Sequence, residues 1–581
     1  MDNNPSLSKY FGEAEVPPAS QFFDEIGSAP SDMIQSVYLG SDEVAETTTA
    51  NLFTQNMTVS FSQNQPQDEL TFSNIVPTVS GTTAVPAASL PDPSTFFDNI
   101  GPEPLIGVAP VKSTVTSPDI LAHAMDGLAL KTEQVDKEAD RRRDAWIPNE
   151  EAKKTLMKAQ SSPKGSFFPE REVLTMPGLV MEEELPDALH EVAVKHLGVS
   201  SAGSRGALRA DHVSRDEAGL RELLRTGCLR AALNLTTELI NAAGQGSGRI
   251  GRPTRHTPRS LQLWLTRFAL FVRLKMHDVL AKEAEAFGDF GKPDMFYQFY
   301  PETYGSRSGS LVPFSLRLLV CELPAQGARG GLCADRLYAL RATVRQMLAN
   351  LREGKTEDGT APISSEQDKS DSIRLWSGRE IRITHSIVNC ALALKDYRLA
   401  TRTLTSLLPP TPELSGTQLS ATQQRLVSSA LCRVSVQAGH LRAAVRHLQV
   451  ATEARHQQCP TPDVREYVDL GLVDVALGKY QDAYTHFVKA ADQEPTNIMV
   501  ANNTAVCLLY MGRLKEAIAV LQKAINSDPE RGLNESLLVN LCTLYELESS
   551  NTNEKKLSLL RMLCKYKSDT IPNVLECLKL A

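Results

Sequence analysis

The sequence has no long hydrophobic run of the kind that spans a membrane. Its most apolar stretch, Leu261 to Met276, is interrupted by Arg267, Arg273 and Lys275 at helical spacing, which is typical of a helix in a globular protein. The first residues, MDNNPSLSKYFGEAE, have no basic start and no apolar core, so they do not match a secretory signal peptide. We therefore expect a cytoplasmic protein with no direct membrane insertion, which reaches membranes only through partners.

Paired metal ligands are also missing from the sequence. All ten cysteines lie after residue 227, are scattered and form no CxxC pair, whereas zinc sites need paired ligands at short spacing. We expect buried thiols in a reducing compartment, and we predict no metal and no cofactor.

No group of residues predicts catalysis. The run GQGSGRIGRP, residues 244–253, has glycines at phosphate-loop-like spacing, but it lacks the Gly-Lys-Ser/Thr ending of such a loop. The histidines have no acidic neighbour in a ligand-like motif. We predict that the protein is not an enzyme.

Basic residues are almost absent from the first fifth of the chain. Residues 1–111 contain 14 acidic residues and one basic residue, Lys9, so they carry about −13, and the remainder carries about +5. An acidic segment rich in Ser, Thr, Pro and Asn cannot bury enough apolar surface to offset its ordering entropy. We predict a disordered acidic tail over residues 1–120. The remainder has no basic stripe, so we predict no nucleic-acid partner.

A short motif occurs twice in this tail. SQFFDEIG at residues 20–27 recurs as STFFDNIG at residues 94–101. Paired aromatics beside an acid are typical of a linear docking motif, and two copies raise avidity. The motif resembles the two-phenylalanine acidic motif that binds VAP receptors of the endoplasmic-reticulum membrane, but Glu25 and Asn99 stand where that motif has a small residue. A coat-protein receptor is an equal alternative, and local stickiness without a receptor is the simpler one. The predicted binding residues are Phe22, Phe23, Asp24, Ile26, Phe96, Phe97, Asp98 and Ile100.

After the tail the pattern becomes helical, with almost no strand alternation from about residue 213 onward. We predict a transitional, partly helical region over 121–210, in which KTEQVDKEADRRRDAW forms a solvated helix. Degenerate helical hairpins follow over 211–375, with a flexible insertion near 355–372. We expect tetratricopeptide repeats and a carboxyl-terminal cap over 376–581.

A 34-residue repeat near the carboxyl end decides the predicted architecture. Small residues fit where antiparallel helices touch, glycine ends the first helix of a pair, and proline ends the second. Weaker copies lie at 381–414 and 425–458, and two degenerate copies lie around Gly227 and Trp264. We predict an all-α tetratricopeptide-repeat superhelix, or α-solenoid. The matched pairs are Gly478 and Gly512, Ala483 and Ala517, Ala490 and Ala524, and Pro495 and Pro529.

The concave face of such a superhelix predicts peptide or protein binding. We predict that six residues line this repeat groove, although they could equally pack against neighbouring repeats or a partner subunit. The set lacks the Lys, Asn and Arg clamp with which co-chaperones grip carboxylate-ended peptides, which disfavours the alternative of a co-chaperone-like peptide-binding adaptor. The six residues are Arg465, Leu472, Val475, Asn502, Val506 and Tyr510.

The run LGLVDVALGKYQDAYTHFVKAADQEPTNIMVANNTAVCLLYMGRLKEAIAVLQKAINSDP resembles the tetratricopeptide-repeat subunit of the TRAPP trafficking complex, its subunit twelve. The resemblance extends from about Asp144, in the stretch DAWIP, to Ala581. It implies a non-catalytic scaffold of a vesicle-tethering, Rab-activating complex in endoplasmic reticulum to Golgi transport and autophagy. Other TRAPP subunits would be its partners. The implied location is the ER-Golgi intermediate compartment and Golgi, with a mitotic role at the kinetochore.

Overall fold

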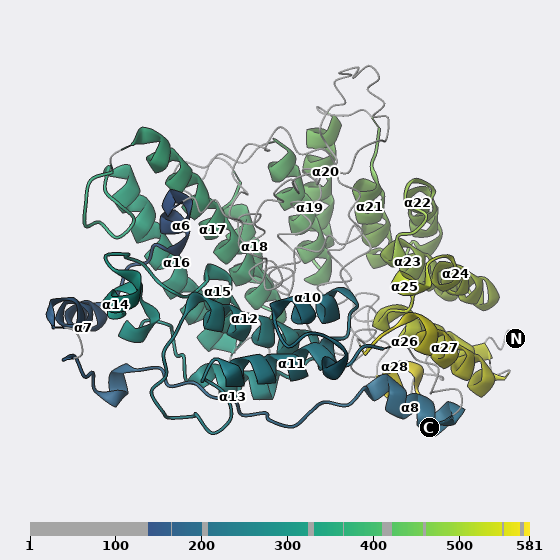
Figure 1. Cartoon of the computed structure of the whole chain (residues 1–581). Coiled ribbons are helices and arrows are strands. Elements are labelled where there is room, and N and C mark those ends of the chain that lie inside the picture. The colour runs from purple at the N-terminus through teal and green to yellow at the C-terminus, as the bar shows by residue number, and fades with distance from the viewer. Residues whose placement is uncertain are drawn as a thin grey trace, which may run out of the picture.

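The computed structural model describes residues 137–163, 166–199, 207–323, 330–363, 365–408, 421–456, 461–548, 551–569 and 574–580. The acidic tail and both Phe-Phe-Asp motifs lie outside these residues. In the described part, β-structure is limited to two isolated bridges, between Phe296 and Ser310 and between Lys355 and Pro362, and the regular elements are helices (Figure 1). The all-α prediction is confirmed.

Most helices form antiparallel pairs, as the repeat pattern predicts. The pairs are α10 (Glu217–Arg225) with α11 (Leu229–Ala242), α12 (Pro258–Arg273) with α13 (His277–Glu285), α17 (Glu366–Ala393) with α18 (Tyr397–Thr405), α19 (Ala421–Gln437) with α20 (Leu441–His456), α21 (Val464–Ala476) with α22 (Tyr480–Gln493), α23 (Ile498–Tyr510) with α24 (Leu514–Ser527), and α26 (Glu535–Glu548) with α27 (Thr552–Tyr566). The two degenerate hairpins expected around Gly227 and Trp264 are the first two of these pairs.

Other helices connect or flank the pairs. The long α16 packs along α17. The α-helices are α6 (Lys137–Asp144), α7 (Glu150–Ser161), α8 (Ala188–Leu197), α14 (Pro301–Tyr304), α15 (Phe314–Glu322), α16 (Gly330–Arg352), α25 (Pro529–Gly532) and α28 (Val574–Leu578), and the 3-10 helices are η2 (Arg171–Val173), η3 (Ala210–His212), η4 (Pro293–Met295) and η5 (Tyr297–Phe299).

The two helices within a pair are joined by a recurring turn geometry. A residue with φ between +56° and +76° follows the first helix, and the next N–H donates to the carbonyl five residues earlier, as Lys479 N does to Asp474 O at 2.8 Å. This hydrogen bond satisfies a carbonyl that the helix end leaves without a partner. Glycine accepts the left-handed conformation without strain, so the glycine signal in the repeats has a direct cause. The left-handed residues are Gly227, Lys275, Lys395, Gly439, Gly478 and Gly512.

The DAWIP stretch lies at the junction between two parts of the core. The Asp144 carboxylate accepts a hydrogen bond from the Tyr297 hydroxyl at 2.9 Å and pairs with Arg307 at 2.6 Å. The Trp146 ring lies 6.2 Å from the Trp376 ring, centroid to centroid. The early segment therefore connects α17 to η5 and to the loop that precedes α15.

Helix α6 differs from the solvated helix that the charged stretch predicts. Arg141 pairs with Glu357 at 3.1 Å, and Arg142 pairs with Asp368 at 2.9 Å. The four side chains are half-buried or buried. The prediction of a wet helix face is wrong because these charges have partners more than 200 residues away in the chain.

The segment near 355–372 also differs from the predicted flexible insertion. Residues 355–363 form a turn in which Thr356 N donates to Ala361 O at 2.7 Å and Ile363 N donates to Gly354 O at 2.9 Å. Residues 366–372 are the first turns of α17. The polar composition of residues 355–372 is typical of a loop, but arginines of α6 pair with the acidic side chains of Glu357 and Asp368.

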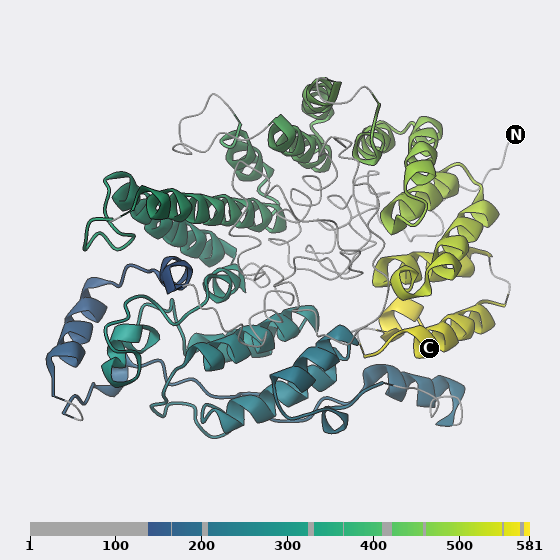
Figure 2. The same ribbon diagram turned by 45° about the horizontal axis from the view of Figure 1, so that its top comes forward.

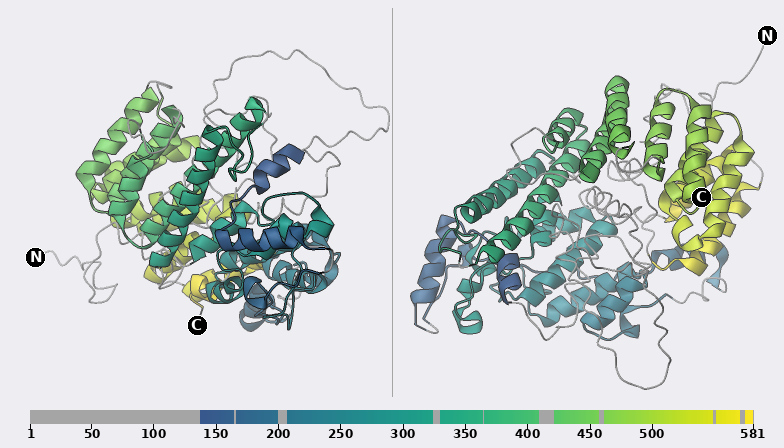
Figure 3. Two further views of the ribbon diagram at one scale, coloured as in Figure 1. Left: turned by 90° about the vertical axis from the view of Figure 1, so that its left-hand side faces the viewer. Right: turned by 90° about the horizontal axis from the view of Figure 1, so that it is seen from above.

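The two ends of the helical array meet (Figures 2 and 3). Leu189 and Val192 of α8 belong to the same apolar cluster as the side chains of α26, α27 and α28. Lys275, at the end of α12, pairs with Glu535 at 2.9 Å. The superhelix is therefore closed by contacts between its early and late helices, and we call this set of contacts the seam.

Candidate functional site: a polar interface between repeats

The predicted repeat-packing residues lie in the helix pairs α21/α22 and α23/α24 and in the turns that follow their helices. Ala483, Ala490 and Ala517 are fully buried, and Ala524 is half-buried. Gly478 and Gly512 lie in the left-handed turns. Pro495 follows the end of α22, and Pro529 ends α24 and begins the short α25.

The predicted repeat groove does not form as an open surface. Leu472, Val475 and Val506 are 2% to 7% exposed and pack inside the core, so the prediction that they line an accessible groove is wrong. The alternative, packing against neighbouring repeats, describes them. The reason is that the first helix of each pair contacts helices of its own and the adjacent repeats.

The other three groove residues have separate surroundings. Asn502 accepts a hydrogen bond from Asn540 Nδ2 at 2.6 Å, which joins α23 to α26. The Tyr510 ring stacks on Tyr480 with centroids 4.5 Å apart and planes at 4°. Arg465 lines a pocket between α19, α20 and α21.

Three arginine–carboxylate pairs hold α21 against the pair α19/α20. Arg433 Nε pairs with Asp469 at 2.6 Å, and both side chains are at most 2% exposed. Arg425 pairs with Asp463 at 2.6 Å. A third pair joins Arg455 of α20 to Glu466 of α21.

Apolar packing at this interface is small. The buried apolar cluster between the two pairs consists of Cys432, Ala444, Leu448 and Val473. The pair α19/α20 is therefore attached to α21 largely through charged side chains, whose interaction depends on charge and geometry as well as on contact area. By contrast, the core between α24 and α26 is apolar.

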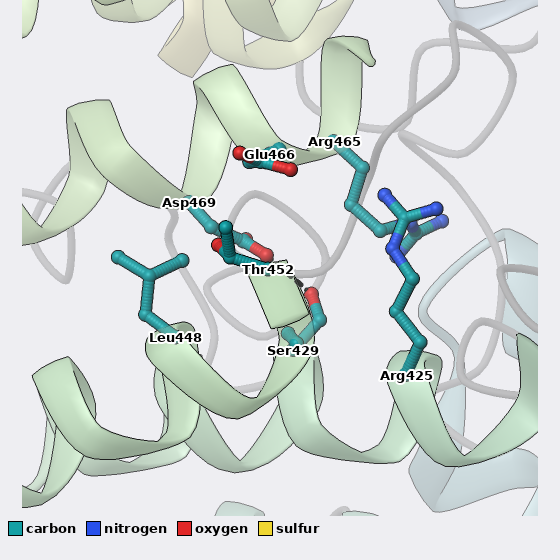
Figure 4. Close-up of a pocket in the computed structure, with 8 residues that line it drawn as sticks. Arg425, Ser429, Leu448, Thr452, Arg465, Glu466 and Asp469 are labelled. Carbon is teal, nitrogen blue, oxygen red and sulfur yellow. Dashed lines mark hydrogen bonds between the residues drawn. The ribbon is translucent and has the colours of Figure 1, made fainter. Parts of the chain in front are cut away.

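A small pocket opens at this interface, with a volume of about 200 Å³ that includes open solvent. Figure 4 shows the Arg425 and Arg465 guanidinium groups converging on one side of it, with Ser429 and Asp469 nearby. The Ser429 hydroxyl donates to Asp469 Oδ2. The lining residues are Arg425, Ser429, Leu448, Ala451, Thr452, Arg465, Glu466 and Asp469.

The charged side chains around the pocket have shifted pKa values. Burial, together with the charge of Arg433, lowers the pKa of Arg465 to about 10, so this side chain remains charged at neutral pH. Burial alone would raise the pKa of Asp463, but the hydrogen bond and charge of Arg425 hold it below its ordinary value. Guanidinium groups bind carboxylates and phosphates in bidentate geometry. Here carboxylates of the chain itself already pair with arginines of the interface.

These polar residues, apart from Arg465, are not among those predicted from the sequence. A usable pattern was present, since Arg433 stands in the apolar run LCRVSV and Asp469 in YVDLGLV. A charged residue inside an apolar helical run is buried only when it has a partner. The partners lie 36 to 40 residues apart, so the run alone does not identify them.

A second polar arrangement lies at the seam. Asp569 Oδ2 accepts hydrogen bonds from the backbone N–H groups of Arg230 and Ala231, at 2.7 and 3.1 Å. The Ser568 hydroxyl donates to Gly227 O at 2.7 Å. The amino terminus of α11 has no side-chain cap from its own Cys228, so a residue more than 300 positions later provides the cap.

The remaining expectations about chemistry concern cysteines, metals and membranes. The described cysteines are free thiols, buried or half-buried, and Cys459 lies outside the described residues. Among the residues that the structure describes, no group of three or more His, Cys, Asp or Glu is placed to hold a metal ion. Nor does that part of the chain contain a helix with the length and apolar character needed to cross a membrane.

Comparisons with known proteins place this chain in a family. The family model of the coatomer epsilon subunit matches residues 469–571. The chain is 34% identical over 522 residues to human trafficking protein particle complex subunit 12, an alignment that covers 88% of this chain and 70% of the relative. It is 36% identical over 446 residues to the mouse protein of the same name, covering 76% of this chain and 54% of the relative. The chain therefore spans about half the length of the mouse relative.

Among solved structures, the chain is similar to YrrB, a tetratricopeptide-repeat protein with an unusual peptide-binding site. The sequence identity is 18% and the TM-score is 0.21, with 33% of this chain and 87% of that chain covered.

Proposed function

The chain belongs to the family of trafficking protein particle complex subunit 12, and from this membership we propose that it is a scaffold subunit of that complex. The observation that carries the proposal is the sequence identity of 34% over 88% of the chain. The partners are the other subunits of the complex. The protein holds them together and has no catalytic role of its own.

The arrangement of the repeats supports a role as a scaffold. The repeats pack into an array whose ends are joined at the seam, so the outer faces of the second helices keep fixed positions relative to one another. A rigid array of this kind presents several surfaces at once, which suits a subunit that contacts more than one partner.

The finer assignment follows from the same family. We propose that the protein acts in vesicle tethering and Rab activation during transport from the endoplasmic reticulum to the Golgi, and in autophagy, from the cytoplasmic side of these membranes. A mitotic role at kinetochores belongs to the same proposal. The tail motifs bind a coat protein or a receptor of the endoplasmic-reticulum membrane.

The test is quantitative mass spectrometry of the proteins that co-purify with the full-length chain from cells. A second preparation carries alanine at Phe22, Phe23, Phe96 and Phe97. We expect the other complex subunits with both forms, and loss of one membrane or coat protein with the variant. Absence of complex subunits from both forms, with chaperones in their place, would overturn the proposal in favour of a co-chaperone.

A further inference from the structure

The second helices α18 and α20 each keep one side exposed to solvent. Ala400 and Leu404 of α18 are buried against the neighbouring helices, and Ala444 and Leu448 hold the same positions in α20. By contrast, every residue of the first helix α17 from 376 to 392 is buried. The exposed sides of α18 and α20 therefore belong to the outer surface of the array.

Arginine occupies this exposed side at equivalent positions in both helices. Arg398 and Arg442 follow the left-handed residue of the preceding turn by three positions, and Arg402 and Arg446 follow it by seven. All four side chains are exposed. Residues four apart lie on the same face of a helix, so each helix carries one pair of arginines. We call these four residues the arginine ladder.

The charges of the arginine ladder are not balanced by the chain. Within the described residues, none of its four guanidinium groups pairs with a carboxylate, whereas Arg425 and Arg433 at the repeat interface do. With histidine counted as neutral, the exposed charged residues of α18, α20 and the turns before them are five basic and two acidic, a net charge of +3. They are Lys395, Arg398, Arg402, Arg442 and Arg446, with Asp396 and Glu453.

This positive surface is confined to two neighbouring helix pairs. The equivalent positions are Gln481 and Thr485 in α22, and Lys515 and Ala519 in α24, so the ladder is not a general property of the repeat. The array of helices is curved (Figure 2). A flat surface that touches a curved array from outside meets only a few neighbouring helices. A charged patch of two helices matches such a contact.

The composition of the patch favours a lipid surface over a protein partner. Protein interfaces depend on aromatic or apolar anchors at their centre. Among the described residues of this patch, the large apolar side chains that are exposed are Leu394 in the turn before α18 and Val450 beyond Arg446 on α20, so they lie at its ends. A bilayer with anionic lipids attracts basic residues through its negative surface potential and needs no central anchor.

We propose that the arginine ladder binds the surface of a bilayer that contains anionic lipids. The four guanidinium groups lie against the headgroups, and no helix crosses the bilayer. The chain then contacts the membrane directly, which goes beyond the expectation that partners alone bring it there. The choice of a bilayer rests on the proposed function at the cytoplasmic side of membranes, where the leaflet is negatively charged.

The experiment is flotation of the purified full-length chain with vesicles of phosphatidylcholine, with and without about 30% phosphatidylserine. We expect binding to the anionic vesicles only. Removing the ladder charges should weaken this binding about tenfold or more, because each basic side chain near the surface adds to the attraction. The variant that removes them is R398Q/R402Q/R442Q/R446Q. The matched control, which removes four exposed lysine charges from α7 and α24 and should bind like the wild type, is K154Q/K158Q/K515Q/K523Q.

Replacing the four arginines by lysine separates attraction to a charged surface from recognition of protein carboxylates. A lipid surface attracts positive charge as such, so R398K/R402K/R442K/R446K should keep vesicle binding within about threefold of the wild type. Bidentate pairing with carboxylates requires the planar guanidinium group and would be lost. Raising the salt concentration from about 0.1 to about 1 M should release the wild type from the vesicles.

Three results would overturn the proposal. The first is absence of wild-type binding to the anionic vesicles, and the second is equal binding by the glutamine variant and its matched control. The third is unchanged vesicle binding of the glutamine variant together with loss of one co-purifying protein from cells, since the ladder would then bind an acidic protein. Failure of the proposed function is separate, because it appears as absence of complex subunits from the wild-type preparation and leaves vesicle binding unaffected.

Discussion

At the scale of single residues, the interface between α19/α20 and α21 depends on charged side chains that are buried. Arg433 and Asp469 are at most 2% exposed and pair with each other, and Asp469 also accepts a hydrogen bond from the Ser429 hydroxyl. Removing two charges from water is costly, and only close, well-directed contacts compensate for it. Removing one member of such a pair leaves a buried charge without its partner, so it lowers the free energy of unfolding by more than the pair itself contributes.

Replacing Asp469 by Asn should expose this dependence. The substitution removes the negative charge and leaves Arg433 buried without it, so the free energy of unfolding should fall by about 3 to 5 kcal/mol. Denaturant unfolding followed by circular dichroism measures the change. Asp492, which is exposed on α22, gives the control D492N, expected within about 0.5 kcal/mol of the wild type. Equal midpoints for D469N and the wild type would show that the pair is dispensable.

Asp569 at the seam should make stability depend on pH in the opposite direction from a salt-bridged carboxylate. Burial raises the pKa of Asp569 to about 6, although backbone N–H groups of Ala231 and Arg230 oppose the shift. The folded state therefore holds a proton that the unfolded state releases between the two pKa values. The stabilisation that protonated Asp569 contributes is lost as pH rises through about 6 and is recovered as pH falls toward 4.

The measurement is the free energy of unfolding of wild type and D569N from pH 7 to pH 5. Asn cannot ionise, so the difference between the two proteins should change by about 1 kcal/mol over this range, in favour of the wild type at low pH. A difference that stays constant with pH would show that Asp569 has its ordinary pKa.

At the scale of elements, the turn after the first helix is built in the same way in six of the helix pairs, with different residues. Gly439, Gly478 and Gly512 adopt positive φ without strain, while Lys275 and Lys395 adopt it at φ +56° and +58°. The left-handed conformation costs a residue with a Cβ about 1 to 2 kcal/mol. The geometry is therefore imposed by the helix pair, and the glycines are an adaptation to it.

Exchanging the residue at this turn should move stability in both directions. Lys395 is exposed, so K395G removes backbone strain and should raise the free energy of unfolding by about 0.5 to 1 kcal/mol, reduced by the greater freedom of glycine in the unfolded chain. The converse substitution G478A should lower it by about 1 kcal/mol. Thermal and denaturant melts measure both. Destabilisation by K395G would mean that the lysine side chain itself supports the turn.

At the scale of the whole molecule, closure at the seam makes the two ends of the chain depend on each other. In an open solenoid, each repeat contacts only its neighbours. Here α8 packs on α27 and α28, and Asp569 caps α11. A disturbance of α8 should consequently reach helices that follow it by more than 300 residues.

Replacing Leu189 by Ala tests this coupling. Leu189 is 1% exposed within the cluster of α26 to α28, and truncating such a leucine costs about 2 to 5 kcal/mol. We expect faster hydrogen exchange in α27 and α28 as well as in α8, and a larger radius of gyration by small-angle scattering. The control V199A changes a side chain that is 73% exposed just after α8. It should leave hydrogen exchange in α8, α27 and α28 and the radius of gyration unchanged. Faster exchange confined to α8 would show that the seam does not couple the ends.

The sequence by itself determined the helical pairs and their packing residues. The 34-residue offset, the small residues at helix crossings and the glycine after the first helix all follow from contacts within one repeat or between neighbours. Such contacts are local, so Ala483, Ala517 and Gly478 could be assigned without coordinates. The same limit explains the errors, because periodicity shows that Leu472 and Val475 share a helix but not which neighbour covers them.

Only the tertiary structure decided the long-range arrangement. The pairs between α19 and α21, the partners of α6 and the cap that Asp569 gives to α11 join residues that are dozens to hundreds of positions apart. Which residues meet depends on the curvature of the array, and this curvature accumulates from a small rotation at each repeat. No single repeat encodes that sum, so the seam forms only when all the repeats are assembled.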